Sequence, residues 1–119
     1  MAKYLLLIYG NEERWDTISA ADMNQIDAGH RAFAAEAGAA ILGSGQLEPS
    51  NQARTLRTRQ GGAKPAITDG PFIETKEVVG GYYVVEAATM ERALTLAGLL
   101  AETRQDHSGV QVHPLVNHG

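Results

Sequence analysis

Residues 3–9 read KYLLLIY, a run that is apolar at nearly every position. A run of this length without a polar interruption is typical of a strand buried on both of its faces. Residues 77–87, EVVGGYYVVEA, repeat this property around Tyr82-Tyr83-Val84-Val85. These two segments predict two strands of a sheet that are buried on both faces.

Two helices are predicted beside these strands. Ser19 and Asp22 resemble a capping box, which predicts that the first helix begins there, and Gly38 ends it. Its inner stripe recurs at spacings of three and four and comprises Met23, Ile26, His30, Phe33 and Ala37. Thr89 predicts the N-cap of a second helix that extends to about residue 104. The inner stripe of that helix comprises Met90, Ala93, Leu94, Ala97, Leu100 and Ala101.

Weaker strand patterns cover residues 40–47, 53–59, 65–68 and 110–115. Gly43 and Gly45 predict a bulge or a close backbone approach in the first of these, and the next two form a hairpin. The order is β-α-β, a hairpin, then β-α-β. It predicts a single α+β domain over residues 1–119, with a ferredoxin-like sheet and both helices on one face.

Two strands of the predicted sheet are apolar on both faces, yet the two predicted helices can cover only one face. The second face must therefore be buried by another chain, and a second copy is the simplest partner. We expect a homodimer that pairs the two sheets face to face.

The chain has 119 residues, no cysteine and a net charge of −4 at pH 7. The acidic balance disfavours nucleic acid as the main partner, because neutralising phosphates requires a surplus of Lys and Arg. The absence of cysteine excludes disulfides and thiolate metal sites. No apolar run approaches the roughly 20 residues that span a bilayer, and the N-terminus lacks the pattern of a signal peptide. We expect a cytoplasmic protein without a membrane partner.

No metal or cofactor is expected from the sequence. His107, His113 and His118 lack the spacing of a metal site. Gly43-Ser44-Gly45 is not followed by the Lys and Ser/Thr of a phosphate-binding loop.

His30 is the most informative single residue, because it lies on the inner stripe of the first predicted helix between Ile26 and Phe33. It is either a structural histidine, bonded to a backbone carbonyl or to Asp27, or an acid–base group at the rim of a pocket. The residue pattern leaves both interpretations open.

Residues 68–77, TDGPFIETKE, place a turn, an aromatic ring and several charges close together. This segment is either a well-specified turn with a solvated loop, or part of a site. In the second interpretation Asp69 orients His30 or accepts a proton, and Lys76 receives an anionic group of the substrate. Glu74, Phe72 and Tyr82 are further candidates for substrate binding, with Phe72 also anchoring the loop.

The predicted hairpin is locally basic, with no acidic residue between Glu48 and Asp69. Such a surface either binds an anionic ligand or acidic partner or, as we prefer, is a solvated edge strand. The basic residues concerned are Arg54, Arg57, Arg59 and Lys64.

Residues 3–10 together with residues 68–83, TDGPFIETKEVVGGYY, resemble the YCII-related superfamily. The tetrapeptide Asp69-Gly70-Pro71-Phe72 identifies the chain, within that superfamily, as similar to the DGPF-domain group. Gly45-Gln46-Leu47-Glu48-Pro49 and Val112-His113-Pro114-Leu115 extend the resemblance over nearly the whole chain.

The resemblance implies a dimeric α+β barrel with a His on the first helix and an Asp near the pocket as a catalytic pair. His30 fits the first position, and Asp69 is the candidate for the second. His113 departs from relatives, which often carry Arg there, so the substrate here is expected to differ or its binding to depend on pH. Some members are dehydrochlorinases of chlorinated hydroxyquinones, and DGPF proteins are often encoded beside extracytoplasmic-function sigma factors.

The sequence thus predicts a small-molecule pocket used by a cofactor-free lyase or isomerase with His30 and Asp69. The alternative is a non-catalytic ligand-binding or accessory protein in sigma-factor signalling. A cofactor-free oxygenase on the same barrel has no discriminating signature here.

Overall fold

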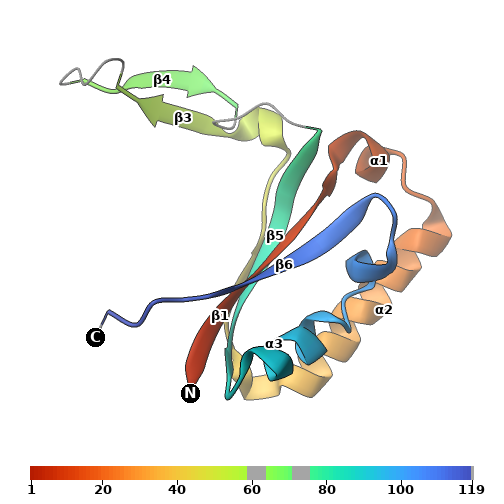
Figure 1. Cartoon of the computed structure of the whole chain (residues 1–119). Helices are drawn as coiled ribbons and strands as arrows, with labels where there is room; N and C mark the ends of the chain where they lie inside the picture. The colour runs from red at the N-terminus through yellow and green to blue at the C-terminus, as the bar shows by residue number, and fades with distance from the viewer. Residues whose placement is uncertain (59–63, 71–75, 119) are drawn as a thin grey trace.

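The computed structural model describes residues 1–58, 64–70 and 76–118. Its centre is an antiparallel sheet in the order β2-β5-β1-β6 (Figure 1). The four strands are β1 (Ala2–Asn11), β2 (Ile41–Gln46), β5 (Glu77–Ala87) and β6 (Ser108–Pro114). This order with its crossing helices is ferredoxin-like, so the predicted α+β class is confirmed.

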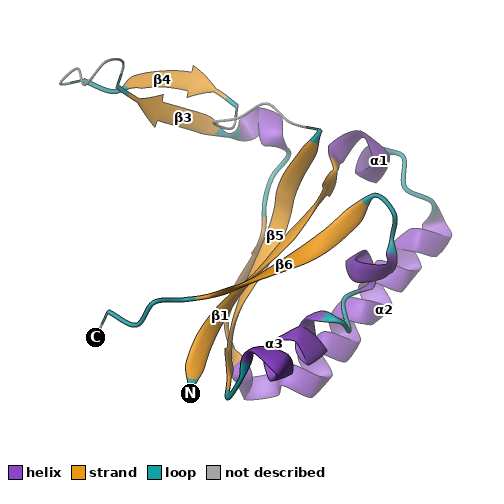
Figure 2. Ribbon diagram, in the orientation of Figure 1, coloured by secondary structure: helices purple, strands orange, loops and turns teal. Residues whose placement is uncertain are grey.

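The two long helices, α2 (Ala20–Ala37) and α3 (Met90–Ala97), lie on the same face of this sheet (Figure 2). Both begin at the predicted caps, because the Ser19 and Thr89 side chains accept hydrogen bonds from backbone amides of the first turn. A five-residue helix, α1 (Glu12–Asp16), was not predicted. The side chain of Asn11 caps it at the end of β1.

The second predicted helix is shorter than the sequence suggested. It ends at Ala97, and the chain turns at Gly98 before the short 3₁₀ helix η3 (Ala101–Arg104). Its stripe was also partly wrong, because Leu94 is 52% exposed whereas Leu96 is fully buried. The turn at Gly98 brings Leu100 back into the core from outside the helix.

The core lies between the helices and one face of the sheet. Tyr4, Leu6 and Ile8 of β1 are buried there, together with Phe33 of α2. The alternate residues of β1 point to the opposite face and are only half-buried. Within the described part of the chain, one face of the central strands is therefore covered and the other face is open.

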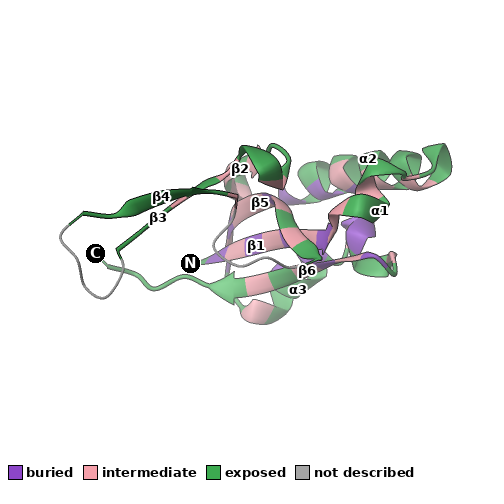
Figure 3. Cartoon of the chain, turned by 90° about the horizontal axis from the view of Figure 1, so that it is seen from above, coloured by how far each residue is buried: buried purple, intermediate pink, exposed green. Residues whose placement is uncertain are grey.

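A second, two-stranded sheet projects from the main one (Figures 1 and 3). It pairs β3 (Arg54–Arg57) with β4 (Ala66–Asp69), as the hairpin prediction required. Leu56 and Ile67 face each other across this pair and are 61% and 67% exposed. The short 3₁₀ helices η1 (Gly38–Ala40) and η2 (Ser50–Gln52) flank β2.

The predicted bulge in β2 is confirmed, because the pairing register with β5 shifts between Ile41 and Gly43. Gly45 also allows the close approach expected of it, since a Cβ there would lie 2.7 Å from the ring of Tyr82. Among the described residues, no helix combines the length and apolarity needed to cross a membrane.

Candidate functional site

A cavity of about 560 Å³ opens between the N-terminal half of α2 and the end of the main sheet. Ile26 and Met23 of the predicted stripe face this cavity, so only the C-terminal half of the stripe, with Phe33 and Ala37, reaches the core. The apolar wall of the cavity includes Ile8, Trp15, Ile18, Met23, Ile26 and Val79. Its polar groups lie around His30. The size and the lining of the cavity are typical of a small-molecule site.

His30 stands between two side chains that also line the cavity. Its Nδ1 lies 2.6 Å from Tyr83 Oη, and its Nε2 lies 2.8 Å from Glu102 Oε2. The Glu102 residue is only 5% exposed, whereas the His30 side chain is 29% exposed. The three groups form a line from a buried carboxylate to a phenol at the cavity.

The chemistry of the partners fixes how this line is hydrogen-bonded. An ionised carboxylate only accepts hydrogen bonds, so Nε2 of His30 donates to Glu102. In a neutral imidazole Nδ1 is then the acceptor, and the hydroxyl of Tyr83 donates to it. Burial, and next the negative charge of Glu102, raise the pKa of Tyr83, so its phenol is protonated at neutral pH.

Packing holds Tyr83 in this position from the core side. The ring of Phe33 contacts that of Tyr83, with the ring centroids 4.4 Å apart and tilted by 43°. Phe33 lies one turn after His30 on α2 and is fully buried. The helix and strand β5 therefore set the geometry of the His30–Tyr83 contact.

Asp69 is not the carboxylate that contacts His30 in this chain. It lies in β4 of the projecting hairpin, its side chain is 90% exposed, and Arg54 forms an ion pair with it at 3.2 Å. The strand β4 that ends at Asp69 belongs to the projecting hairpin and not to the main sheet on which α2 lies (Figure 1). The predicted His30–Asp69 contact is thus replaced by His30–Glu102.

Of the remaining predicted site residues, the structure describes Tyr82 and Lys76 but not Phe72 and Glu74. Tyr82 borders the cavity, but its side chain lies on the face of β5 opposite to that of Tyr83. Lys76 is exposed and is not part of the lining. Phe72, Glu74 and the tight turn at Pro71 lie outside the described residues. Gly70 before that turn has φ of +85°, a conformation that favours glycine.

Sequence reasoning missed Glu102 because the second helix was predicted to extend to about residue 104, with an inner stripe that does not include this residue. A signal was present, since Glu102 directly follows the apolar segment Leu99-Leu100-Ala101. A single acidic residue beside such a segment has no spacing that distinguishes a buried carboxylate from a solvated one. Only the turn at Gly98 determines that this side chain points inward.

Trp15 of α1 forms the wall at the far end of the sheet. Its indole lies over Gly10 and Gly80, where an added Cβ would come within 2.5 Å and 2.7 Å of ring atoms. The indole N–H donates to Ser108 Oγ at 2.8 Å. Both glycines are therefore required for the indole to lie flat on the sheet.

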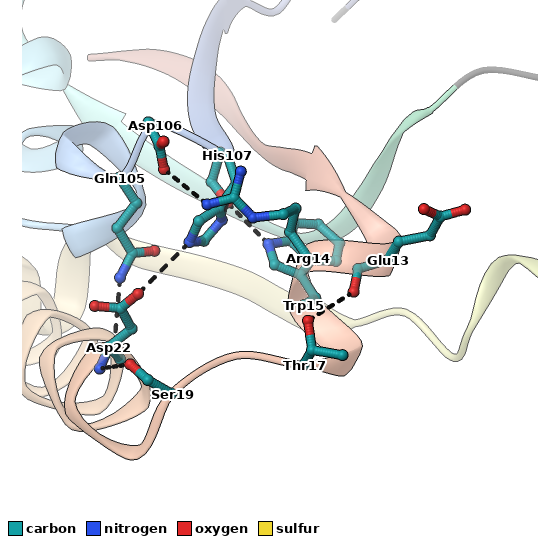
Figure 4. A network of polar contacts seen from close by, with 10 residues as sticks. Glu13, Arg14, Trp15, Thr17, Ser19, Asp22, Gln105, Asp106 and His107 are labelled. Atoms are coloured by element: carbon teal, nitrogen blue, oxygen red, sulfur yellow. Dashed lines mark hydrogen bonds and ion pairs between the residues drawn. The ribbon is translucent and has the colours of Figure 1, made fainter.

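His107 supports this wall from behind. Its Nδ1 lies 2.7 Å from Ser108 Oγ, and its Nε2 points toward Asp22 at 4.0 Å (Figure 4). Because Ser108 accepts from Trp15, its own hydroxyl hydrogen is available to His107. Within the described part of the chain, no group of three His, Cys, Asp or Glu side chains could hold a metal ion.

At the mouth of the cavity, hydrogen bonds between Glu12 and Ser50 connect α1 to the base of the hairpin. The carboxylate of Glu12 accepts hydrogen bonds from the hydroxyl and the backbone amide of Ser50. These bonds, the hydroxyl one first, lower the pKa of Glu12, because they favour its charged form.

Comparison with known proteins gives one family and one distant relative. The family model of the YCII-related domain matches residues 2–115. An uncharacterized protein from Rhizobium meliloti (strain 1021) is 36% identical over 70 residues. That match covers 59% of this chain and 55% of the relative, so it spans about half the length of either protein.

Proposed function

This chain belongs to the YCII-related family, and we propose that it binds a small molecule in the cavity and carries out cofactor-free acid–base chemistry on it. The Tyr83–His30–Glu102 line is the observation that carries the proposal. Tyr83 and His30 are the catalytic residues in this account, and Glu102 is a positioning residue.

In the proposed step two protons are transferred in the same direction, one from the ligand to Tyr83 and one from Tyr83 to His30. Tyr83 Oη takes a proton from carbon or oxygen of the ligand as its own hydroxyl proton passes to Nδ1 of His30. The imidazolium that forms is paired with the Glu102 carboxylate at 2.8 Å, which stabilises it. In the reverse direction His30 and Tyr83 return a proton to the product.

Elimination and isomerisation are the reactions that this arrangement suits. Both need a base to remove a proton and an acid to return one, inside a site that partly excludes water. The raised pKa of Tyr83 keeps the phenol protonated between turnovers, so the relay begins each cycle in one state.

A neutral aromatic probe tests this proposal without a known substrate. In 5-nitrobenzisoxazole, a base removes the carbon-bound proton as the ring N–O bond breaks, and the cyanophenolate formed absorbs visible light. We expect the wild type to accelerate this opening, and His30→Gln and Tyr83→Phe each to lower the rate by about 100-fold or more. Equal rates for the wild type and both variants would remove the catalytic proposal.

The non-catalytic alternative keeps the cavity but removes the chemistry. It is favoured by one observation, that both ring nitrogens of His30 are already hydrogen-bonded within the chain. In that case the protein is a ligand-binding or accessory component, with the link to extracytoplasmic-function sigma factors as its proposed context. Ligand binding with no difference in rate among the variants would support this alternative.

We also propose the homodimer that the sequence predicts. Leu5 pairs with Val84, and Leu7 with Tyr82, on the open face of the main sheet. These four side chains are half-buried in the single chain. A second copy that covers them would complete the burial expected for apolar central strands.

A further inference from the structure

We propose that the ligand of this cavity is a flat, apolar molecule that carries a positive charge, such as a protonated arylalkylamine. The inference rests on the proposed function, because it concerns the ligand of the same site. It differs from the sequence-based hypothesis, in which Lys76 received an anionic group.

Charge is distributed unevenly around the cavity. Five of its lining residues are acidic, namely Glu12, Asp16, Asp27, Glu48 and Glu102, and none of the described lining residues is Lys or Arg. Over the whole chain, in contrast, ten basic residues stand against fourteen acidic ones. Such a cavity attracts cations and repels anions.

Glu102 adds a buried charge to this field. Its Oε1 is inaccessible to solvent and has no hydrogen-bond partner among the described residues, while Oε2 is bonded to His30. A carboxylate that is only half satisfied, in a poorly hydrated wall, exerts a stronger field on the cavity than a solvated one. The charge of a bound cation would compensate it.

Two further acidic groups are placed to meet a ligand amine. Asp27 precedes His30 by three residues on α2, so it lies on the same side of the helix. The charged form of Glu12 is favoured, because hydrogen bonds from Ser50 lower its pKa. Both line the cavity.

The indole of Trp15 is the reason to expect a flat, apolar ligand. Its indole is fixed against the sheet by Gly10 and Gly80, and it lines the cavity. The face of an indole attracts both aromatic rings and cations. The cavity therefore combines an aromatic wall with carboxylates and a proton relay.

Three probes that differ only in one end group test the inference. They are tyramine, which is cationic, 4-ethylphenol, which is neutral, and 3-(4-hydroxyphenyl)propionate, which is anionic. Trp15 is the only tryptophan of the chain, so the change in its fluorescence on excitation at long wavelength reports binding directly. We expect tyramine to bind about tenfold tighter than 4-ethylphenol and the propionate to bind weakest, with the preference reduced by salt.

Variants that each remove one acidic charge identify which carboxylate produces the preference for the cationic probe. Asp27→Asn should reduce the preference for tyramine over 4-ethylphenol severalfold and leave 4-ethylphenol binding unchanged. Glu36→Gln is the matched control on the same helix, because Glu36 does not line the cavity and should leave the preference intact.

The outcomes separate this inference from the proposed function. If 4-ethylphenol binds and tyramine binds no tighter, or the propionate binds tightest, the charge inference is wrong and the cavity proposal stands. If none of the three probes changes the fluorescence of Trp15, both are wrong.

Discussion

Glu102 Oε2 lies 2.8 Å from His30 Nε2, although 72 residues separate the two in sequence. Helix α2 supplies the histidine, and the turn after α3 supplies the carboxylate. The contact defines which ring nitrogen of His30 carries hydrogen and leaves the other for Tyr83. It is the structural basis of the predictions that concern proton transfer.

Glu102→Gln should move the pKa of Tyr83 down toward its usual value. The charge of Glu102 is the second cause of the raised pKa, and burial, the first, remains in the variant. Titration of tyrosine absorbance between about pH 8 and 13 measures the shift, with Tyr83→Phe identifying which transition belongs to Tyr83. An unchanged transition would mean that the two groups do not interact.

The hydrogen bonds between Glu12 and Ser50 should stabilise the fold at neutral pH and lose this effect in acid. Because the folded-state pKa of Glu12 is lowered, its contribution is present above the unfolded value of about 4.5 and is lost as pH falls through the folded value. Chemical denaturation at pH 7 and pH 3 should therefore show a smaller acid-induced loss for Ser50→Ala than for the wild type. The same loss in both proteins would contradict the role of Ser50.

Gly80→Ala should displace the Trp15 indole from the sheet. An added Cβ would lie 2.7 Å from ring atoms, so the indole must move, and overpacking of this kind typically costs about 1–3 kcal/mol. We expect a red-shifted Trp15 emission and a lower melting temperature. Gly43→Ala is the control, since nothing lies within 4 Å of its Cβ position and its emission should match that of the wild type.

Val84→Asp should prevent dimer formation and destabilise the chain, because it places a charge on the open face of β5 opposite Leu5. Val116→Asp makes the same change at a side chain that is 75% exposed and should leave the protein as it is. Sedimentation at micromolar concentration measures both. A wild-type monomer, or a Val84→Asp variant that remains a stable dimer, would contradict the proposed interface.

The periodicity of the sequence was sufficient for the main elements. Apolar runs located β1 and β5, and Ser19 and Thr89 located the helix starts, because these signals depend on neighbouring residues. The bulge in β2 followed from its glycines in the same way.

Long-range geometry could not be read from these local signals. His30 was identified, but its carboxylate was not, because the direction of Glu102 depends on where the chain turns after α3. Asp69 attracted attention through a dense turn motif, yet it ends β4 of the hairpin, where its side chain is 90% exposed and pairs with Arg54. The Trp15 wall depends on two glycines in different strands, which no local pattern connects.

The rates of benzisoxazole opening by Glu102→Gln and Asp69→Asn, compared side by side, test the central claim most directly. Each variant replaces one carboxylate by its neutral isostere, and Asp69 serves as the matched carboxylate on the hairpin. The account predicts that Glu102→Gln lowers the rate by about tenfold or more, because the imidazolium loses its counter-charge, and that Asp69→Asn keeps the wild-type rate. A loss of rate in Asp69→Asn, with none in Glu102→Gln, would contradict it.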